Sequence, residues 1–279
     1  MNKLLTFILI TFVSSAQAHE IATQEYSQLF KNYHGCFILY DLNKHKIVSE
    51  YNPNDHCHQR IAPDSTFKIA LSLMAFDKGI INQHTAFKWD GKKADLPDWN
   101  QNQTPSSWLK YSVFWVSQQI TPQLGYARIK NYLAAFHYGN QDFSGDPDKH
   151  NGLNYAWVSG SLKISAIEQL HFLKSMLSSE LPLTQDAIAN TKKNLYLGKL
   201  NNGADYYGKT GSGQHGRSAR QTHPSKLRDG WFVGFIENGA QQYIFVSNLT
   251  DKASPSTDKL YGSQILKPIT MQLLNDYFA

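Results

Sequence analysis

The 279-residue chain is 41% hydrophobic and 13% aromatic, which is enough apolar content for a sizeable core and excludes an intrinsically disordered chain. Its formal net charge is +5, and its basic residues are scattered rather than clustered, which argues against a nucleic-acid partner and favours small anionic ligands. A chain of this length suits one large domain or two closely packed ones.

The start of the chain has the layout of a secretory signal peptide. Lys3 is followed by a nearly continuous apolar run over residues 4–13, and Ala16-Gln17-Ala18 supplies small residues for cleavage. The run is too short to span a membrane, and no cysteine follows it that could carry a lipid anchor. We therefore expect residues 1–18 to be removed and the mature chain to reach the periplasm without a membrane anchor. A retained N-terminal anchor is the alternative.

Residues 35–40 and 46–51 predict two antiparallel strands joined by a turn at Asn43-Lys44-His45. Cys36 lies in the first of these strands and Cys57 follows the second. Exported proteins fold under oxidising conditions, where two such cysteines form a disulfide or remain free thiols, and the sequence leaves both states open.

The segment Asp55-His56-Cys57-His58 resembles half of a zinc site. No second cluster of histidine and cysteine supplies the remaining ligands of a tetrahedral ion. We therefore favour a solvated turn at this position and expect no metal.

The clearest helix spans residues 64–78, with Pro63 before it and Gly79 after it. Its apolar residues extend to nearly every face, which indicates a buried central helix. The following stretch, 80–160, is rich in Trp, Asn, Gln and Pro, and its pattern predicts short helical pieces at 105–116 and 125–136. Further helices are expected at 163–177 and 183–193.

The pattern then changes to short β-rich runs separated by Gly and Asn turns, at 194–197, 206–212, 231–237 and 242–249, and residues 260–278 close the chain as a helix. Strands at both ends of the chain with helices between them predict an α+β fold, an antiparallel β-sheet flanked by helices with an inserted all-helical domain. We divide the mature chain into a first α/β part (19–62), a mainly helical subdomain that carries the buried helix (63–160) and a second α/β part (161–279).

A serine and a lysine three residues apart can act as a nucleophile and its base, because both side chains lie on one face of a helix. The spacing occurs at Ser65–Lys68, Ser107–Lys110 and Ser256–Lys259. Only the first pair opens the buried helix, where burial can keep a lysine amine neutral and able to accept a proton. We therefore predict Ser65 as the nucleophile and Lys68 as its base.

Lys209-Thr210-Gly211 is the second chemical motif. It follows the aromatic pair Tyr206-Tyr207, and we expect it to end that strand, with glycine letting a ligand approach the backbone closely. The lysine and threonine suit a carboxylate, and the next N–H, from Ser212, can donate to a developing oxyanion. A helix-borne Ser-x-x-Lys followed by Lys-Thr-Gly is the motif set of serine β-lactamases and penicillin-binding proteins.

On these motifs and those between them, the chain resembles a class D serine β-lactamase, an oxacillinase. Ser112-Val113-Phe114 is similar to the Ser-x-Val of that class, and Tyr138-Gly139-Asn140 matches its Tyr-Gly-Asn box. Trp157 precedes Leu162-Lys163-Ile164-Ser165 as the tryptophan of the class precedes its Leu-Arg-Ile-Ser helix, and Gly230-Trp231-Phe232-Val233-Gly234-Phe235 matches the strand after Lys-Thr-Gly. The sequence around Ala62-Pro63-Asp64-Ser65 is most similar to that of the narrow-spectrum oxacillinase 1 branch. The resemblance covers essentially the whole mature chain and implies the serine β-lactamase and penicillin-binding protein transpeptidase-like fold.

The resemblance implies hydrolysis of the β-lactam amide bond of penicillins and some cephalosporins, and hence antibiotic resistance. An acyl-enzyme would form on Ser65. Lys68 would be N-carboxylated by CO2 or bicarbonate and would serve as general base, with the Trp157 indole N–H stabilising the carbamate. No other cofactor is implied. A buried lysine agrees with this role, because only a neutral amine adds CO2 near neutral pH.

The other site residues follow from the same resemblance. Ser112 would relay a proton to the leaving nitrogen with support from Lys209, and the N–H groups of Ser65 and Ser212 would bind the oxyanion. The residues implied in substrate binding are Thr210, Gly211, Ser212, Val113, Trp99 and Leu96. Val113 would border the pocket for the hydrolytic water, and Trp99 and Leu96 would roof the cleft, although Trp99 suits the core equally well.

Three features depart from the pattern of the class. The stretch 248–267 contains no arginine to hold the substrate carboxylate, so Thr210, Lys209 or a nearby group must take that role. Val158 stands after Trp157 where leucine is common. The long connection 213–229 is rich in basic residues and is either a basic lip over the site or, as we favour, a solvated hairpin tip.

Other classes share parts of this motif set. A penicillin-recognising transpeptidase or carboxypeptidase typically has Ser-x-Asn as its middle motif and stays anchored, and a class A enzyme would show Ser-Asp-Asn, which is absent here. A non-hydrolytic β-lactam sensor domain carries the same motifs as a class D enzyme, although such modules sit on multi-span membrane proteins. The sequence therefore leaves the sensor as the main alternative.

Overall fold

The computed structural model describes residues 23–216, 226–254 and 258–279. The predicted signal peptide lies outside these ranges. None of the helices within them combines the length and the apolar character that a membrane crossing requires.

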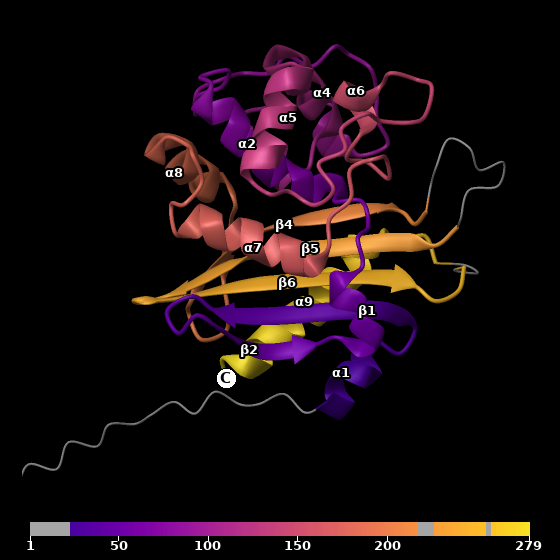
Figure 1. Cartoon of the computed structure of the whole chain (residues 1–279), viewed down its shortest axis with the longest axis vertical. Helices are drawn as coiled ribbons and strands as arrows, with labels where there is room; N and C mark the ends of the chain where they lie inside the picture. Colours follow the sequence, from indigo (N-terminus) through magenta and orange to yellow (C-terminus); the bar gives the residue numbers. More distant parts are fainter. Residues whose placement is uncertain (1–22, 217–225, 255–257) are drawn as a thin grey trace, which may run out of the picture.

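The described strands form one antiparallel sheet in the order β2-β1-β6-β5-β4-β3 (Figure 1). They are β1 (Tyr33–Asp41), β2 (Lys46–Tyr51), β3 (Tyr196–Lys199), β4 (Asp205–Gln214), β5 (Arg228–Asn238) and β6 (Gln241–Asp251). Within the sheet β1 pairs with β6, with Phe37 opposite Ser247, so strands from the two ends of the chain lie side by side. The predicted antiparallel sheet built from both ends of the chain is therefore confirmed.

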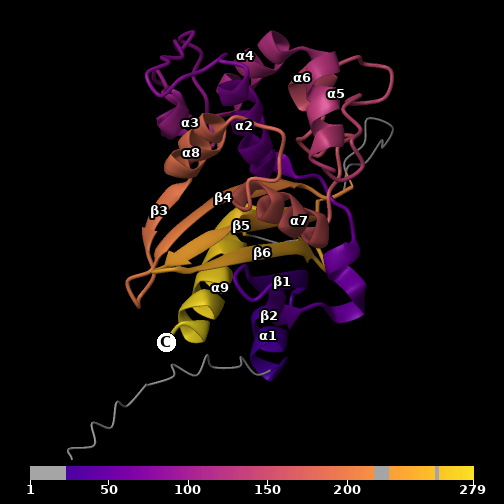
Figure 2. The same ribbon diagram turned by 60° about the vertical axis from the view of Figure 1, so that its left-hand side comes forward.

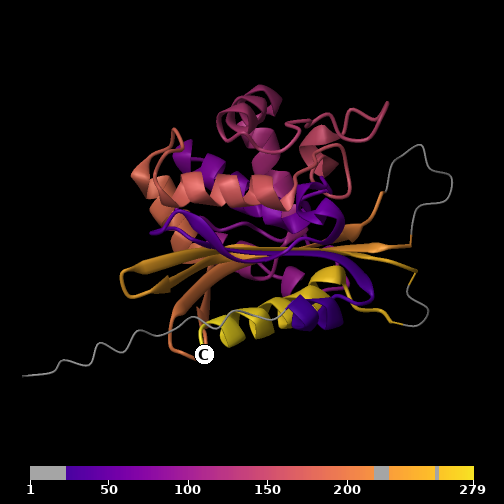
Figure 3. The ribbon, with the colours of Figure 1, turned by 60° about the horizontal axis from the view of Figure 1, so that its bottom comes forward.

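Helices cover both faces of the sheet. Figure 3 shows α1 (Thr23–Leu29) and α9 (Gly262–Tyr277) on one face and α7 (Ala166–Leu177) on the other. Most of the remaining helices follow β2 in the chain and lie beyond the edge of the sheet that β3 and β4 form (Figure 2). They are α2 (Lys68–Asp77), α3 (Pro105–Lys110), α4 (Phe114–Leu124), α5 (Tyr126–Ala135), α6 (Gly152–Tyr155), α8 (Gln185–Asn194) and the 3-10 turns η2 (Asp64–Phe67) and η3 (Pro97–Trp99). The 3-10 turn η1 (Pro53–His58) packs against β1 and α7 instead.

The sheet separates two apolar cores because successive side chains of a strand point to opposite faces. In β5, Trp231 and Val233 join the core shared with α2 and α7, whereas Phe232 joins the core under α9. The first core continues from the sheet into the helical region. The buried side chains of α2 therefore belong to a core that the sheet and the other helices share. The division of the mature chain at residues 62 and 160 stays a prediction.

Several elements differ from expectation. The single helical piece predicted at 105–116 is wrong, because the chain breaks between α3 and α4 where Ser112 adopts φ +59°, a left-handed conformation that an α-helix does not contain. α7 begins at Ala166 rather than at residue 163, since Ser165 and Glu168 form a capping box at its start. α1 and the short α6 were not among the predicted elements.

Cys36 in β1 and Cys57 in η1 form a disulfide with their Cα atoms 5.2 Å apart. This is one of the two states that the sequence left open. The bond links the turn after the β1–β2 hairpin to β1, and it makes the sulfur of Cys57 unavailable to a metal.

Candidate active site

Ser65 and Lys68 lie where η2 runs into α2. Lys68 Nζ donates a hydrogen bond to Ser65 Oγ over 2.9 Å, and the lysine is fully buried. The residues of α2 from Lys68 to Phe76 are all buried, which confirms the predicted central helix. Of the other two Ser-x-x-Lys pairs, Ser107 caps the start of α3, and Ser256 lies outside the described residues.

The surroundings of Lys68 favour its neutral form. Burial lowers the pKa of Lys68 to about 7, and the nearby Asp64 opposes that shift. A substantial fraction of the amine is therefore unprotonated near neutral pH, with its lone pair within hydrogen-bond distance of the Ser65 hydroxyl. This arrangement can take a proton from Ser65 and so activate it as a nucleophile.

Asp64 is a site residue that the sequence reasoning missed. It is only 1% exposed, and its Oδ1 accepts a hydrogen bond from Ser159 N over 3.0 Å. Burial, reinforced by Asp229, raises the pKa of Asp64 to about 8. A largely protonated Asp64 carries little of the charge that would otherwise hold a proton on Lys68. The one signal in the sequence was its position next to Ser65. An aspartate at the start of a helix is otherwise interpreted as an ordinary capping residue.

Lys209-Thr210-Gly211 lies within β4, so the prediction that it ends the strand is wrong. β4 continues to Gln214 and pairs with β5 along its length. A Cβ on Gly211 would lie 3.0 Å from the Pro63 carbonyl oxygen and 3.3 Å from Ser65 N. The absence of a side chain thus lets the strand backbone pass directly beside the nucleophile turn.

Lys209 and Ser112 are both held in unusual states. Lys209 is 3% exposed, and burial, followed by the proximity of Lys68 and Lys267, keeps its pKa well below the usual value. Ser112 sits in the break between α3 and α4 in a left-handed conformation, which for a residue other than glycine costs about 1–3 kcal/mol. That conformation brings Ser112 to the wall of the cavity that contains Ser65.

A cavity of about 370 Å³ has Ser65 in its wall. The predicted site residues that line it are Ser65, Leu96, Trp99, Ser112, Thr210, Gly211 and Ser212. The other lining residues are Asp64, Phe114, Tyr155, Val158, Tyr261 and Ser263, of which Val158 was noted only as a departure from the class pattern. The structure therefore gathers segments between residues 64 and 263 around one nucleophile.

Val113 does not line this cavity, and its implied place beside the hydrolytic water stays a prediction. Its side chain is fully buried in the core, and Phe114 lines the cavity instead. Val113 is the N-cap of α4, and Phe114 is the first residue of that helix. Because neighbouring residues point in different directions, the side chain of Val113 enters the core while that of Phe114 faces the cavity. The aromatic ring of Phe114 lies 5.9 Å from that of Tyr155, which also lines the cavity.

Trp157 lies behind the cavity wall and is fully buried. Its ring centroid is 5.5 Å from that of Phe67 and 6.0 Å from that of Phe143, both in stacked arrangements. Within the described chain its Nε1 has no hydrogen-bond partner. Because a buried donor without an acceptor is unfavourable, an anionic group placed here would be stabilised. Phe67, against which the indole packs, directly precedes Lys68.

The ends of the connection 213–229 are tied to the sheet. Arg228 belongs to β5 and binds Asp251 over 2.8 Å and Asp258 over 2.7 Å, so it is not part of a basic lip. His215 pairs with Asp229 over 2.9 Å. The other basic residues that suggested a lip fall largely in 217–225, outside the described residues, and for them both interpretations stay open.

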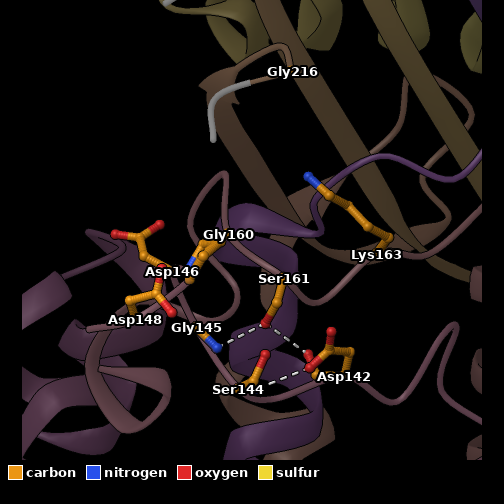
Figure 4. Close-up of a pocket in the computed structure, with 10 residues that line it drawn as sticks. Asp142, Ser144, Gly145, Asp146, Asp148, Gly160, Ser161, Lys163 and Gly216 are labelled. Atoms are coloured by element: carbon orange, nitrogen blue, oxygen red, sulfur yellow. Dashed lines mark hydrogen bonds between the residues drawn. The ribbon is translucent and has the colours of Figure 1, made fainter. Parts of the chain in front are cut away.

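A larger cavity, of about 560 Å³, lies between the loop 142–148 and Lys163 (Figure 4). Three of the residues that line it are Asp142, Asp146 and Asp148. It shares no lining residue with the cavity that contains Ser65. We therefore place the chemistry in the smaller cavity.

The segment 55–58, considered above as half of a zinc site, forms part of η1. His58 Nδ1 pairs with Asp55 over 2.6 Å. Across 23–216, 226–254 and 258–279, no group of three or more His, Cys, Asp or Glu side chains is arranged to hold a metal ion.

Comparison with known proteins places these observations in a family. The penicillin binding protein transpeptidase domain matches residues 20–275. The chain is 48% identical over 242 residues to the β-lactamase OXA-1 of Escherichia coli, covering 86% of this chain and 84% of that protein. It is 35% identical to the methicillin resistance protein MecR1 of Staphylococcus aureus over 87% of this chain, which spans 39% of that longer protein.

Solved structures agree with the sequence comparison. The OXA-427 class D β-lactamase superposes with a TM-score of 0.77 at 35% identity, covering 88% of this chain and 98% of the other. The C-terminal domain of the BlaR penicillin receptor of Bacillus licheniformis superposes with a TM-score of 0.76 at 29% identity, covering 90% and 93%.

Proposed function

The chain belongs to the penicillin-binding protein transpeptidase family and, within it, to the class D β-lactamases, and from this membership we propose that it hydrolyses the β-lactam amide bond of penicillins and some cephalosporins. The reaction proceeds through an acyl-enzyme on Ser65 and gives resistance to these antibiotics. The observation that carries the proposal is the 2.9 Å contact between Ser65 Oγ and the buried Lys68 Nζ, beside the backbone of β4.

In the acylation step, Ser65 Oγ attacks the carbonyl carbon of the β-lactam ring while its proton passes to Lys68. The ring C–N bond then breaks, and the leaving nitrogen takes a proton relayed by the Ser112 hydroxyl. Lys209, buried nearby, supports this transfer. The N–H groups of Ser65 and Ser212 stabilise the negative charge that develops on the carbonyl oxygen.

The surroundings of Lys68 also suit N-carboxylation by CO2, as the class D resemblance implies. The amine is buried and substantially neutral near neutral pH, and the unpartnered Trp157 Nε1 is a donor behind the cavity wall. When present, the carboxylate supplies an anionic base for activating the water that hydrolyses the acyl-enzyme. Trp157 would hold that base by donating a hydrogen bond, and the aromatic rings packed on the indole exclude bulk water.

Trp157→Phe should impair deacylation more than acylation, because it removes the donor and retains most of the apolar packing. Loss of one hydrogen bond to a buried charge corresponds to about 1–3 kcal/mol, or roughly 5- to 150-fold in rate. Stopped-flow measurements should show acyl-enzyme accumulating, and bicarbonate should restore part of the turnover at mildly acid pH.

The matched control for this variant is Trp89→Phe, which removes an indole donor that binds Lys92 O away from the cavity. Its deacylation rate should equal that of the parent. If Trp157→Phe slowed neither step, or if bicarbonate had no effect in parent or variant, the stabilised base would lose its support.

A non-hydrolytic sensor is the second candidate, favoured by the 35% identity to MecR1 and the likeness to the BlaR receptor domain. A sensor would be acylated once by a chromogenic cephalosporin and then stop, giving a burst of about one product per protein. The proposed hydrolase should instead turn over steadily at a rate proportional to enzyme concentration. A burst without later turnover would contradict the proposal and favour the sensor.

The place of action that fits this function is the periplasm. The apolar leader at 4–13, the small residues at Ala16-Gln17-Ala18 and the oxidised Cys36–Cys57 pair support export to an oxidising compartment. Its binding partners there are β-lactam small molecules.

A further inference from the structure

Asp64 joins three segments that surround the nucleophile turn. It is the first residue of η2, and its Oδ1 accepts a hydrogen bond from Ser159 N over 3.0 Å. Ser159 Oγ in turn accepts a hydrogen bond from Gln214 N, at the end of β4, over 2.9 Å. The carboxyl group of Asp64 therefore connects the residue before Ser65 to the loop 157–160 and, through that loop, to β4.

The backbone on both sides of this contact adopts an unfavourable conformation. Asp64 has φ +47° and Ser159 has φ +48°, left-handed values that residues other than glycine rarely adopt. Such a conformation persists only where the surrounding contacts hold it in place. The loop that the contact holds contains Trp157 and also Val158, which lines the cavity. The Asp64–Ser159 hydrogen bond therefore fixes the loop behind the nucleophile.

The space around the Asp64 carboxyl group suits a neutral acid. A Cβ on Gly213 would lie 2.3 Å from Asp64 Oδ2, so the glycine in β4 leaves room for the carboxyl group. Within the described chain Oδ2 is buried and has no hydrogen-bond partner. A buried carboxylate anion is stable only when its oxygens accept hydrogen bonds, so a partner at Oδ1 alone favours the protonated form. The raised pKa of Asp64, about 8, agrees with this geometry and is caused mainly by burial.

Asp229 of β5 is the charged group that acts most strongly on Asp64. It is buried, and its carboxylate accepts hydrogen bonds from His215 Nδ1 over 2.9 Å and from Thr250 Oγ1 over 2.6 Å. Two neighbouring carboxylates repel each other when both are ionised. The donors around Asp229 favour the charge on that residue and leave the proton on Asp64.

Basic groups act on Asp64 from two other elements. They are Lys68 of α2 and Lys163, which precedes α7. The other titratable groups around this cluster are Lys209 of β4, His215 after β4 and His56 of η1. Among these groups Lys68 is the base that contacts Ser65. A negative charge on Asp64 would stabilise the protonated form of Lys68, which cannot accept the proton of Ser65.

We propose that Asp64 is a positioning residue that works as a neutral acid. Its carboxyl group holds the loop 157–160 against the nucleophile turn, and its ionisation at alkaline pH keeps Lys68 protonated and so inactive as a base. This inference rests on the proposed hydrolysis at Ser65, because it concerns the proton on the base of that reaction. Asp64 thereby sets an upper pH limit on activity.

The test compares the pH profiles of kcat/KM for benzylpenicillin in the parent, Asp64→Asn and Asp64→Ala. Asparagine keeps an acceptor for Ser159 N and cannot ionise, whereas alanine has neither an acceptor nor a charge. Between about pH 7 and about pH 9.5 the parent should lose about tenfold or more, and Asp64→Asn should lose less than about threefold. Asp64→Ala should also show no alkaline decline, but its acylation rate should be about tenfold or more below that of Asp64→Asn at every pH.

Asp142→Asn is the matched control, because Asp142 lies at the other cavity and accepts a hydrogen bond from Ser144 N over 2.9 Å. Its pH profile should equal that of the parent. A parental alkaline decline in Asp64→Asn would overturn the role of ionisation. Equal acylation rates in Asp64→Asn and Asp64→Ala would overturn the role in holding the loop.

Unfolding measurements follow the same proton without turnover. An acid whose pKa is higher in the folded chain stabilises the fold at low pH, and this contribution is lost as the pH rises from about 4 to about 8. The free energy of unfolding of the parent, relative to that of Asp64→Asn, should therefore decrease across that window. Parallel curves would overturn the neutral acid. A parent that fails to hydrolyse benzylpenicillin would count against the proposed function, and the unfolding data would still decide the state of Asp64.

Discussion

Replacing Ser65 with alanine should abolish hydrolysis, with kcat/KM for a penicillin falling by about 10⁴- to 10⁶-fold, the range expected when a catalytic nucleophile is removed. The reason is that Ser65 lines the cavity and its hydroxyl contacts the buried amine of Lys68. The side chain is small and only partly buried, so the fold and non-covalent binding should be retained. Mass spectrometry of the parent should find an acyl adduct on the peptide that contains Ser65, and the adduct should be absent from the variant.

Ser107→Ala provides the matched control, because Ser107 stands in a second Ser-x-x-Lys pair. Its hydroxyl caps α3, so the variant should lose about 1 kcal/mol in the free energy of unfolding while its kcat/KM stays at the parental value. An adduct on Ser107, or undiminished activity in Ser65→Ala, would contradict the assignment of the nucleophile.

Replacing Lys68 with methionine should lower the acylation rate by about 10²- to 10⁴-fold, the usual contribution of a general base. Methionine fills a similar volume in the core but cannot accept a proton. Lys110→Met, a change at the lysine of the second pair, should leave the rate unchanged. Single-turnover kinetics with a chromogenic substrate separate acylation from deacylation, and both rates should fall in Lys68→Met. A parental acylation rate in that variant would remove Lys68 from the mechanism.

The pH profile gives an independent check on Lys68. Its pKa of about 7 means that the amine gains a proton as the pH falls through this value, so the activity of the parent should decline on the acid side. The unfolded chain has a lysine pKa near the usual value of about 10.4, so between about pH 7 and 10 it binds more protons than the folded chain. The contribution of Lys68 to stability should therefore increase with pH across that window. In Lys68→Met both this stability slope and the effect of bicarbonate on activity should disappear.

Local patterns were enough to predict most elements and two parts of the site. The apolar run in 35–40, followed by a turn and the segment 46–51, predicted the first hairpin, and the all-round apolar helix at 64–78 marked Lys68 as buried. These features follow from which residues share a face of a strand or helix, and that depends only on spacing along the chain. The same reasoning separated Ser65 from Ser107, because only one of them opens a buried helix.

Tertiary packing decided the rest of the site. Ser212 and Ser263 are 51 positions apart and meet only because Gly230 and Gly262 let α9 touch the sheet. Phe114, rather than Val113, reaches the cavity because the chain breaks at Ser112 in a conformation that no periodic pattern predicts. The raised pKa of Asp64 comes from its burial near Asp229, a residue from the far end of the chain. Burial, backbone strain and contact between distant segments depend on how the whole chain packs, and residue spacing alone does not specify that packing.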